Sequence, residues 1–316
     1  MQPSFLCIGF QKCGTTTLFD LLEQHRGVAL PRDVKEPMYY RTPAILRPGG
    51  DRYYQWRYFS HISPDDKRLV GEVNAGLSYC HCAQRLKENF PPETKLIFMM
   101  RNPVDRAWSA YKFFVALGFL PISVTRDDLR LGHAVAFDQY ARRVLGDSRQ
   151  RNKIMKRRLK YLVFSQGNYD TCIGEFDDYF PNKKYILFEE FVRDQKGVCE
   201  DVYRFLEIEP DEDIQYGIKA NETHRAAAGP LRARARNVAK AVDYFFDEFI
   251  GMRCWAPSVY GAYHRFNRFM YRTCTVEDTD RSKMLPETRK LLEDYYRDEK
   301  ERLEARMHRD LSDIWF

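Results

Sequence analysis

Residues 5–17, FLCIGFQKCGTTT, join an apolar segment to a glycine-bracketed turn and a run of threonines. The apolar part predicts a buried β-strand. Leu18, Leu21 and Leu22 follow at helical spacing and predict a helix that begins at the threonines. A turn of this kind before a helix N-terminus favours phosphate binding, because the free N–H groups and the helix dipole attract anions. The segment therefore predicts a phosphate-binding loop at residues 9–17.

This loop departs from the loop that binds ATP. The two glycines have the separation found in a G-x-x-x-x-G-K-[ST] motif, but Thr15 stands where the lysine belongs and Lys12 lies inside the loop. A magnesium-dependent nucleotidase also needs an acidic residue after a neighbouring strand. The apolar run at 95–100 ends instead in Arg101. We therefore expect a phosphate site that uses protein cations and no metal, with a kinase carrying a degenerate loop as an alternative.

The remaining pattern predicts an α/β fold with a central parallel sheet flanked by helices. Strand-like segments at 5–9, 69–73, 95–100 and 184–188 alternate with helical ones, which is typical of a sheet covered on both faces. Asn102-Pro103 predicts a helix start, and a long charged helix is expected over 285–307. Residues 41–68, rich in Tyr, Arg and Pro, suggest an irregular insertion. One domain over 1–316 is the simplest organisation.

The charge and hydropathy of the chain limit the kinds of partner that it can bind. The net charge is +6, and two stretches, 149–160 and 224–241, carry basic residues without acids. Each could be a solvated helix face, or could meet a nucleic acid, a membrane surface or an acidic polysaccharide. Apolar runs fall far short of the roughly 20 residues of a membrane span. The N-terminus shows no signal pattern, so we expect either a complete soluble protein or one whose upstream anchor was trimmed.

A second phosphate-binding segment is expected at 101–109, RNPVDRAWS. Arg101 at a strand end and Ser109 about two turns into the next helix can hold a phosphate from two sides. Two metal-free phosphate sites fit a nucleotide that carries a 5′-phosphate group and another phosphate on its ribose. 3′-Phosphoadenosine 5′-phosphosulfate (PAPS) has this pattern.

At this point the sequence resembles the PAPS-dependent sulfotransferases, in particular their carbohydrate branch. GFQKCGTTTLFDLLEQH looks like their 5′-phosphosulfate loop, RNPVDRAWSAYKFF like their 3′-phosphate motif, and KEPMYY at 35–40 like their catalytic-glutamate segment. The stretch 167–208 and the ending with its tryptophan are also similar to the family. The resemblance implies the P-loop-like sulfotransferase fold, PAPS as donor, 3′,5′-ADP as product and no required metal.

The resemblance also implies roles for individual residues. Glu36 would be the general base, and Lys12 would stabilise charge on the leaving phosphate oxygen. The nucleotide-binding residues would be Lys12, Gly14, Thr15, Thr16 and Thr17 at the 5′ side, Arg101 and Ser109 at the 3′-phosphate, and Arg281 and Lys283 near the C-terminus.

Structural alternatives stand beside these roles. Lys12, Arg101 and Ser109 could be merely structural or solvated. Glu36 could belong to a surface network with Lys35, Arg32 or Arg41. We expect His25, on the apolar face of the first helix, to be a packed or helix-end residue and not a base.

The acceptor is expected to be an anionic glycan. The segment after the second strand, GEVNAGLSY at 71–79, has Val73 where heparan-type enzymes carry a lysine, and is more like the branch that sulfates the 6-position of N-acetylgalactosamine 4-sulfate. Chondroitin or dermatan sulfate is therefore favoured, with the aromatic stretch 53–59 and the basic stretches lining the acceptor groove. A heparan-type glycan, a small hydroxylated metabolite, and a non-catalytic module that binds glycan or nucleic acid are the alternatives.

We expect no nucleic acid partner and no membrane contact by this chain itself. The location would be the Golgi lumen for an anchored protein and otherwise the cytoplasm. Oligomeric state stays open, and Cys254 and Cys274 could pair in an oxidising compartment.

Overall fold

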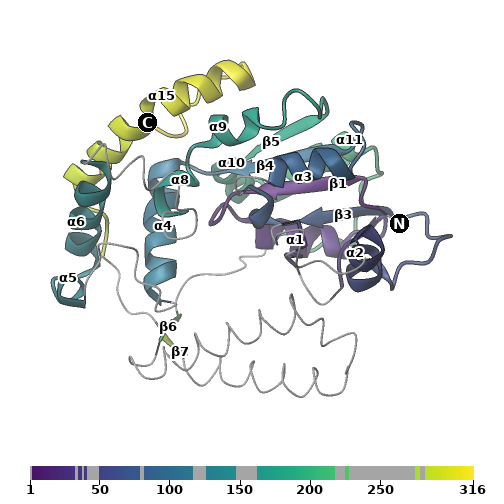
Figure 1. The fold of residues 1–316 in the computed structure, drawn as a ribbon, viewed down its shortest axis with the longest axis horizontal. Helices are drawn as coiled ribbons and strands as arrows, with labels where there is room; N and C mark the ends of the chain where they lie inside the picture. The colour runs from purple at the N-terminus through teal and green to yellow at the C-terminus, as the bar shows by residue number, and fades with distance from the viewer. Residues whose placement is uncertain are drawn as a thin grey trace.

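A computed structural model of the chain shows how these segments are arranged (Figure 1). It describes residues 2–32, 35–37, 39–40, 50–78, 82–116, 126–146, 162–217, 225–227, 275–277 and 282–316.

The centre of the fold is a five-stranded parallel sheet in the order β2-β3-β1-β4-β5. Its strands are β1 (Phe5–Gly9), β2 (Val28–Ala29), β3 (Leu69–Val73), β4 (Lys95–Met100) and β5 (Lys183–Leu187). The predicted α/β class and parallel sheet are confirmed. The two-residue edge strand β2 was not predicted, because two residues are too short for a detectable pattern.

Helices connect the strands and cover the sheet. They are α1 (Thr15–Gln24), α2 (Gly50–Phe59), α3 (Cys82–Asn89), α4 (Pro103–Ala116), α5 (Arg126–Arg130), α6 (His133–Leu145), α8 (Leu162–Ser165), α9 (Tyr169–Gly174), α10 (Phe188–Arg193), α11 (Gln195–Leu206) and α15 (Pro286–Met307), with a 3₁₀ turn η2 (Ala75–Ser78). A separate antiparallel pair joins β6 (Arg225–Ala227) to β7 (Thr275–Glu277).

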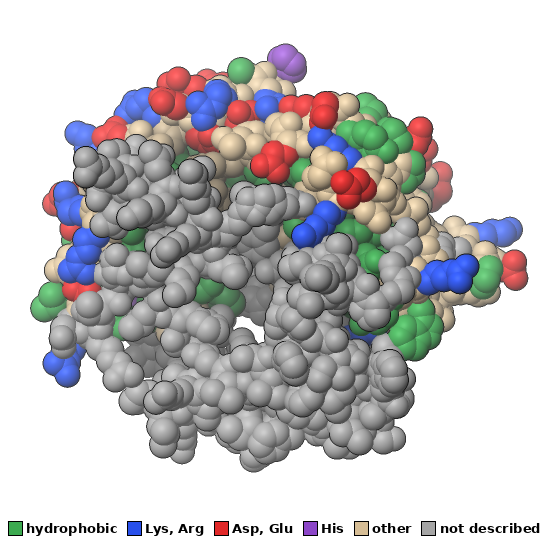
Figure 2. Space-filling model, in the orientation of Figure 1, with side chains coloured by type: hydrophobic (Ala, Val, Ile, Leu, Met, Phe, Trp, Pro, Cys, Tyr) green, Lys and Arg blue, Asp and Glu red, His purple; other side chains and the backbone are tan. Residues whose placement is uncertain are grey.

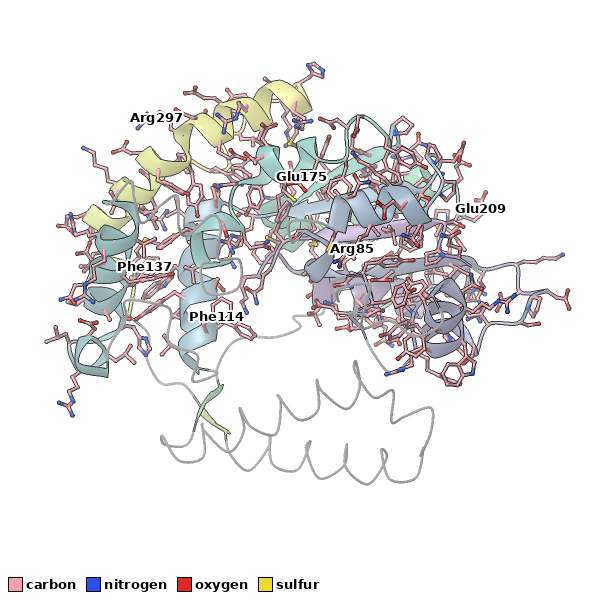
Figure 3. The ribbon with its side chains drawn as sticks, viewed as in Figure 1. Arg85, Phe114, Phe137, Glu175, Glu209 and Arg297 are labelled. Carbon is pink, nitrogen blue, oxygen red and sulfur yellow. The ribbon has the colours of Figure 1, made fainter. Side chains whose placement is uncertain are left out.

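The buried side chains form two hydrophobic clusters. The first surrounds the sheet and includes four of the five residues of β1 and most of β4. The second lies among α4, α6, α8 and α15, which Figure 1 places beside the sheet. Figure 3 shows Phe137 of α6 directed toward α4, where its ring meets Trp108 and Tyr111 at centroid distances of 5.1 Å and 4.9 Å. This second cluster fixes α4, and so the segment that begins at Arg101.

The expectation of an irregular insertion at 41–68 is wrong for residues 50–59, which form α2. Tyr54, Tyr58 and Phe59 are buried in the core beside the sheet, so this helix is held by packing of one aromatic face. Those three rings are therefore unavailable to an acceptor. Trp56, on the same helix, is 51% exposed. Residues 41–49 lie outside the described residues.

The surface that is described carries mixed charge. Figure 2 shows acidic and basic side chains interspersed along the upper edge of the molecule, where α15 runs. Ion pairs within this helix join Arg297 to Asp294 and Lys300 to Glu304. Among the helices in the described ranges, none combines the length and the apolar character that crossing a membrane requires. The basic stretch 149–160 lies outside the described residues, as does nearly all of 224–241.

Candidate active site

The two predicted phosphate-binding segments leave neighbouring strands at the same edge of the sheet. β1 pairs with β4 in parallel, and Gly9 lies opposite Met99. After β1 the chain forms β2 and β3 on one side of β1, and after β4 it forms β5 on the opposite side of β4. The strand order therefore reverses between β1 and β4. Ligands of open α/β sheets bind at the carboxyl ends of the strands where such a reversal occurs. Residues 10–14 and 101–102 flank this position.

The loop after β1 ends in a helix N-terminus that has no side-chain cap. Gly14 is the N-cap of α1 and adopts φ 89°, a left-handed conformation that favours glycine. A Cβ atom at Gly14 would meet the Phe188 ring at 2.9 Å. The first turn of α1, Thr15–Thr17, contains no acidic residue. The loop thus offers its backbone N–H groups and threonine hydroxyls to an anion.

Lys12 lies in a strained and largely buried position. Its φ is 70°, which is uncommon for a residue with a side chain, and such strain is often found at functional sites. Its Nζ lies 4.5 Å from the centroid of the Phe113 ring of α4. Burial and, to a smaller extent, the nearby positive charge of Arg101 lower the pKa of Lys12 to about 8. Because burial and Arg101 both disfavour the charged form of Lys12, an anion bound beside it would stabilise that form.

Arg101 faces the same loop from β4. Its Nη1 donates to the carbonyl oxygen of Lys12 over 3.4 Å, and its guanidinium lies 4.6 Å from the centroid of the Phe188 ring. The Tyr169 hydroxyl donates to the carbonyl oxygen of Arg101 over 2.6 Å. The predicted N-cap is confirmed, because Asn102 Oδ1 accepts from the backbone N–H of Val104 at 3.0 Å. Arg101 is therefore held beside the loop by its backbone and its side chain.

Ser109 lies on α4, partly exposed. It is four residues before Phe113, so the two side chains share one face of the helix. Because Phe113 contacts Lys12, this face is the one turned toward the loop. The binding of a 3′-phosphate by Ser109 stays a prediction.

Glu36 reaches the loop through Lys35. Lys35 Nζ donates to Glu36 Oε1 over 3.0 Å and to Thr15 Oγ1, in the first turn of α1, over 3.1 Å. The ion pair between Lys35 and Glu36 is one that the surface-network alternative allows. The contact with Thr15 nevertheless places the pair against the predicted phosphate-binding loop and not on a distant surface. The site therefore brings Glu36, Lys35 and the helix N-terminus together.

Neighbouring elements anchor the 35–40 segment at two points. Asn74 Nδ2 donates to the carbonyl oxygen of Pro37 over 2.7 Å, and Arg85 Nη1 donates to that of Tyr40 over 2.7 Å. Arg85 comes from α3, as Figure 3 shows. The rings of Tyr39 and Tyr40 are buried. Together these contacts set the backbone on either side of Glu36.

A second carboxyl lies beneath this segment. Glu72 of β3 is fully buried and accepts hydrogen bonds from the hydroxyl of Tyr54 and, over 2.7 Å, from Asn74 Nδ2. The pKa of Glu72 is raised to about 7. Burial is the main cause, the two hydrogen bonds oppose it, and the charge of Glu36 adds to the rise. Asn74 thus connects the buried carboxyl to the backbone beside Glu36.

His25 is a helix-end residue, as predicted. It is buried, its Nδ1 accepts from the backbone N–H of Gly27 at 3.0 Å, and its Nε2 donates to the carbonyl oxygen of Glu209 at 3.0 Å. Burial lowers its pKa, so the neutral form is favoured. It follows the last residue of α1, a helix length of ~15 Å from the loop.

Other predicted groups are not brought to the loop by the described contacts. Lys283 is exposed in the segment before α15, and Arg281 lies outside the described residues. Cys254 and Cys274 also lie outside them. Within the described ranges, no group of three or more His, Cys, Asp or Glu side chains is arranged to hold a metal ion.

The sequence predicted no role at the site for Glu189 or for Trp315. Glu189, at the start of α10, accepts from the backbone N–H of Asn102 over 2.9 Å, and its other oxygen accepts from Trp315 Nε1 over 3.2 Å. The pattern offered one signal, the tryptophan close to the C-terminus. Glu189 is one of the two acidic residues in FEEF at 188–191, a pattern that is typical of any helix start.

Comparison with known proteins agrees with this geometry. The sulfotransferase domain family matches residues 2–223, well over half of the chain. The chain belongs to this family. Its crystallised relative from Alicyclobacillus acidocaldarius, a sulfotransferase, superposes with a TM-score of 0.61 over 99% of this chain and 98% of that one, at 22% identity. This confirms the sulfotransferase fold.

Curated relatives match smaller parts of the chain. Carbohydrate sulfotransferase 15 of Mus musculus is 29% identical over 155 residues, which cover 36% of this chain and 28% of that protein. The human bifunctional heparan sulfate N-deacetylase/N-sulfotransferase 2 is 25% identical over 214 residues, covering 66% of this chain and 22% of that protein. The chain thus matches less than a third of the length of these two relatives.

Proposed function

We propose that this protein is a PAPS-dependent carbohydrate O-sulfotransferase. The observation that carries the proposal is the meeting of three groups at one edge of the sheet: the uncapped N-terminus of α1, the cations Lys12 and Arg101, and the Lys35–Glu36 pair that touches Thr15. Family membership supports sulfuryl transfer as the reaction. Residues 1–316 would form one domain, since α15, beyond the matched range, packs on α4, α6 and α9.

Each group has a role in an in-line transfer. Lys12, Gly14 and Thr15–Thr17 would bind the 5′-phosphosulfate, and Arg101 with Ser109 would bind the 3′-phosphate. Glu36 would take the proton of the acceptor hydroxyl as its oxygen attacks sulfur. Lys12 would stabilise the negative charge that develops on the leaving phosphate oxygen. Chemistry of this kind depends mainly on positioning, which the rigid strand ends provide.

The acceptor would be an anionic glycan, with chondroitin or dermatan sulfate preferred over heparan sulfate. The names of the two curated relatives support a carbohydrate acceptor. An aromatic path also runs from the Glu36 segment: Tyr39 stacks on Tyr53 at 6.2 Å, and Tyr53 meets the exposed Trp56 at 6.3 Å. The partly exposed Tyr53 and the exposed Trp56 would offer a sugar an aromatic surface at the outer end of this path. Val73, where heparan-type enzymes have lysine, favours the galactosaminoglycans.

A panel of acceptors tests this function. Chondroitin, dermatan sulfate, heparan sulfate and small alcohols are incubated with sulfur-labelled PAPS, with Lys12→Ala as the inactive control and a chelator in parallel. We expect label in a galactosaminoglycan, no effect of the chelator, and thermal stabilisation of the wild type by 3′,5′-ADP. Absence of nucleotide binding at millimolar concentration would contradict the proposal, and loss of activity with the chelator would favour a kinase-like mechanism.

A further inference from the structure

The side chain of Lys35 contacts one residue expected to bind the sulfuryl donor and one expected to act on the acceptor. Its Nζ lies 3.1 Å from Thr15 Oγ1 and 3.0 Å from Glu36 Oε1. Under the proposed function, Thr15 lies on the donor side, in the loop that binds the phosphosulfate, while Glu36 lies on the acceptor side. An ammonium that reaches both groups therefore lies where the sulfuryl group must pass.

We propose that Lys35 is a catalytic residue whose ammonium contacts the non-bridging oxygens of the sulfuryl group during transfer. This inference rests on the proposed function. It adds a second cation to the site: Lys12 would act at the leaving phosphate oxygen and Lys35 at the group in transit. The two lysines come from different segments, the loop after β1 and the 35–40 segment, so each can serve its own part of the reacting group.

The transfer balances without a further reactant. The acceptor oxygen forms a bond to sulfur while the bond between sulfur and the 5′-phosphate oxygen breaks. The electron pair of the broken bond stays on the phosphate oxygen, and the acceptor proton goes to Glu36. Lys35 gives and takes no proton; it stabilises the negative charge on the sulfuryl oxygens, a contribution that grows in a site shielded from water.

The surroundings of Lys35 fit such a role better than a surface ion pair. Its side chain is 21% exposed and that of Glu36 is 37% exposed, so the pair is partly shielded yet open to a substrate. Burial raises the pKa of the Cys7 thiol in β1 to about 12, and the charges of Lys35 and Glu36 act on the same thiol in opposite directions. Both charges therefore lie close to the strand that leads into the loop.

The contact with Thr15 also explains why the lysine is held ready. Thr15 is buried at the start of α1, and its hydroxyl fixes one direction of the ammonium. A surface ion pair contributes little and needs no third partner. Here the third partner belongs to the anion-binding loop, and the hydrogen bond can be exchanged for one to a sulfuryl oxygen when the donor arrives.

The test compares turnover with nucleotide binding. Lys35→Gln keeps a hydrogen-bond donor and removes the charge, and Lys35→Arg keeps the charge. We expect Lys35→Gln to lower kcat about 10²- to 10³-fold, as the loss of an electrostatic donor does in other enzymes. Its affinity for 3′,5′-ADP, which has no sulfuryl group, should change less than about threefold. Lys35→Arg should fall between the wild type and Lys35→Gln in kcat.

Controls separate this inference from the function on which it rests. Lys196→Gln removes an exposed lysine from an ion pair with Glu200 and should behave as the wild type. Thermal melting checks that each variant is folded. If the wild type transfers sulfate and Lys35→Gln does so equally well, the inference fails while the function stands. A loss of 3′,5′-ADP affinity equal to that of Lys12→Ala, or equal activity of the Arg and Gln variants, also overturns it. An inactive wild type that binds no nucleotide overturns the function itself.

Discussion

Trp315 and Glu189 are joined by a hydrogen bond, with the indole Nε1 donating to Glu189 Oε2 over 3.2 Å. The other oxygen of Glu189 accepts from the backbone N–H of Asn102 over 2.9 Å. Asn102 follows Arg101, the residue proposed to hold the 3′-phosphate. Trp315 therefore supports the backbone beside the proposed nucleotide site, through a carboxylate that accepts from both the indole and Asn102.

Removing the indole donor should weaken binding of the 3′-phosphate. Trp315→Phe keeps an aromatic ring beside Tyr169 and deletes the hydrogen bond, which contributes about 1 kcal/mol, or roughly a fivefold change in affinity. We expect weaker binding of 3′,5′-ADP, measured by calorimetry, and little change for 5′-AMP, which lacks the 3′-phosphate. Trp56→Phe, on the exposed face of α2, is the control. An equal loss for both nucleotides would show that Trp315 supports the fold in general.

Nucleotide affinity should fall as the pH rises through about 8. The pKa of Lys12 is lowered to about 8, mainly by burial and also by Arg101, so Lys12 loses its charge in that range. A bound anion favours the charged form, and binding near pH 8 should therefore take up a proton. Phosphate monoesters, with a second pKa of about 6, are almost fully ionised by pH 8 and add little change of their own. Calorimetry in two buffers of different ionisation enthalpy measures this uptake.

Lys12→Arg is the matched variant for that experiment. Its guanidinium stays charged throughout, so the affinity of 3′,5′-ADP should no longer depend on pH between about 7 and 9. The same fall in affinity in this variant would assign the titration to another group.

The sheet could be predicted closely from the sequence. The segments 5–9, 69–73 and 95–100 form strands with the expected bounds, and the fourth is displaced by one residue. The runs at 5–9 and 95–100 are short, apolar and almost wholly buried, which is the strongest local signal for a parallel sheet. The helix α2 was missed because the proline and glycines at 48–50 indicate a loop and the exposed Trp56 obscures the helical spacing of the buried Tyr54 and Tyr58.

The site could be predicted only in part. The positions of Lys12 and Arg101 follow from the ends of two adjacent strands, which local patterns define. The contacts of Lys35 with Thr15 and of Trp315 with Glu189 join residues 20 and 126 positions apart. No periodicity or motif spacing encodes such pairs, since they depend on how the connecting segments pack.

The buried Glu72 should make the protein less stable as the pH rises toward neutrality. Its pKa is raised to about 7, chiefly by burial, against 4.5 for an unperturbed glutamate. The folded state then holds a proton that the unfolded state has lost, so stability is fully present below about pH 4.5 and declines through about pH 7. The wild type should lose about 3 kcal/mol more than Glu72→Gln between pH 4.5 and 8.

Urea unfolding of both proteins at pH 4.5, 6 and 8 measures this difference. The comparison across pH cancels any constant cost of placing an amide against Tyr54 and Asn74. A parallel pH dependence in the two proteins would show that folding does not raise the pKa of Glu72.

Replacing Trp56 should weaken binding of the glycan acceptor and leave binding of the nucleotide unchanged. It is 51% exposed and lies at the outer end of the aromatic path from Tyr39 and Tyr53. Replacing it by alanine removes a stacking surface, and we expect the KM for the glycan acceptor to rise about five- to tenfold. The affinity for 3′,5′-ADP should stay unchanged. Val192→Ala, at an exposed apolar position on α10, is the control. An unchanged KM would place the acceptor elsewhere.

Gly9 should tolerate no side chain, because the first turn of α1 packs directly on it. A Cβ atom at this position would lie 1.9 Å from Cγ2 of Thr15. Gly9→Ala must therefore displace Thr15, and with it the loop, so we expect a loss of 3′,5′-ADP affinity of at least about tenfold and about 1–3 kcal/mol of stability. Gly174→Ala, where the nearest atom is at an ordinary 3.4 Å, should be close to neutral.

A second substitution isolates the cause of this loss. Thr15→Ser removes the methyl group that collides with the new Cβ and keeps the hydroxyl that accepts from Lys35. In the Gly9→Ala background it should restore part of the affinity and of the melting temperature, whereas alone it should have a small effect. A double variant as weak as Gly9→Ala would show that the backbone conformation at Gly9, and not contact with Thr15, sets the geometry of the loop.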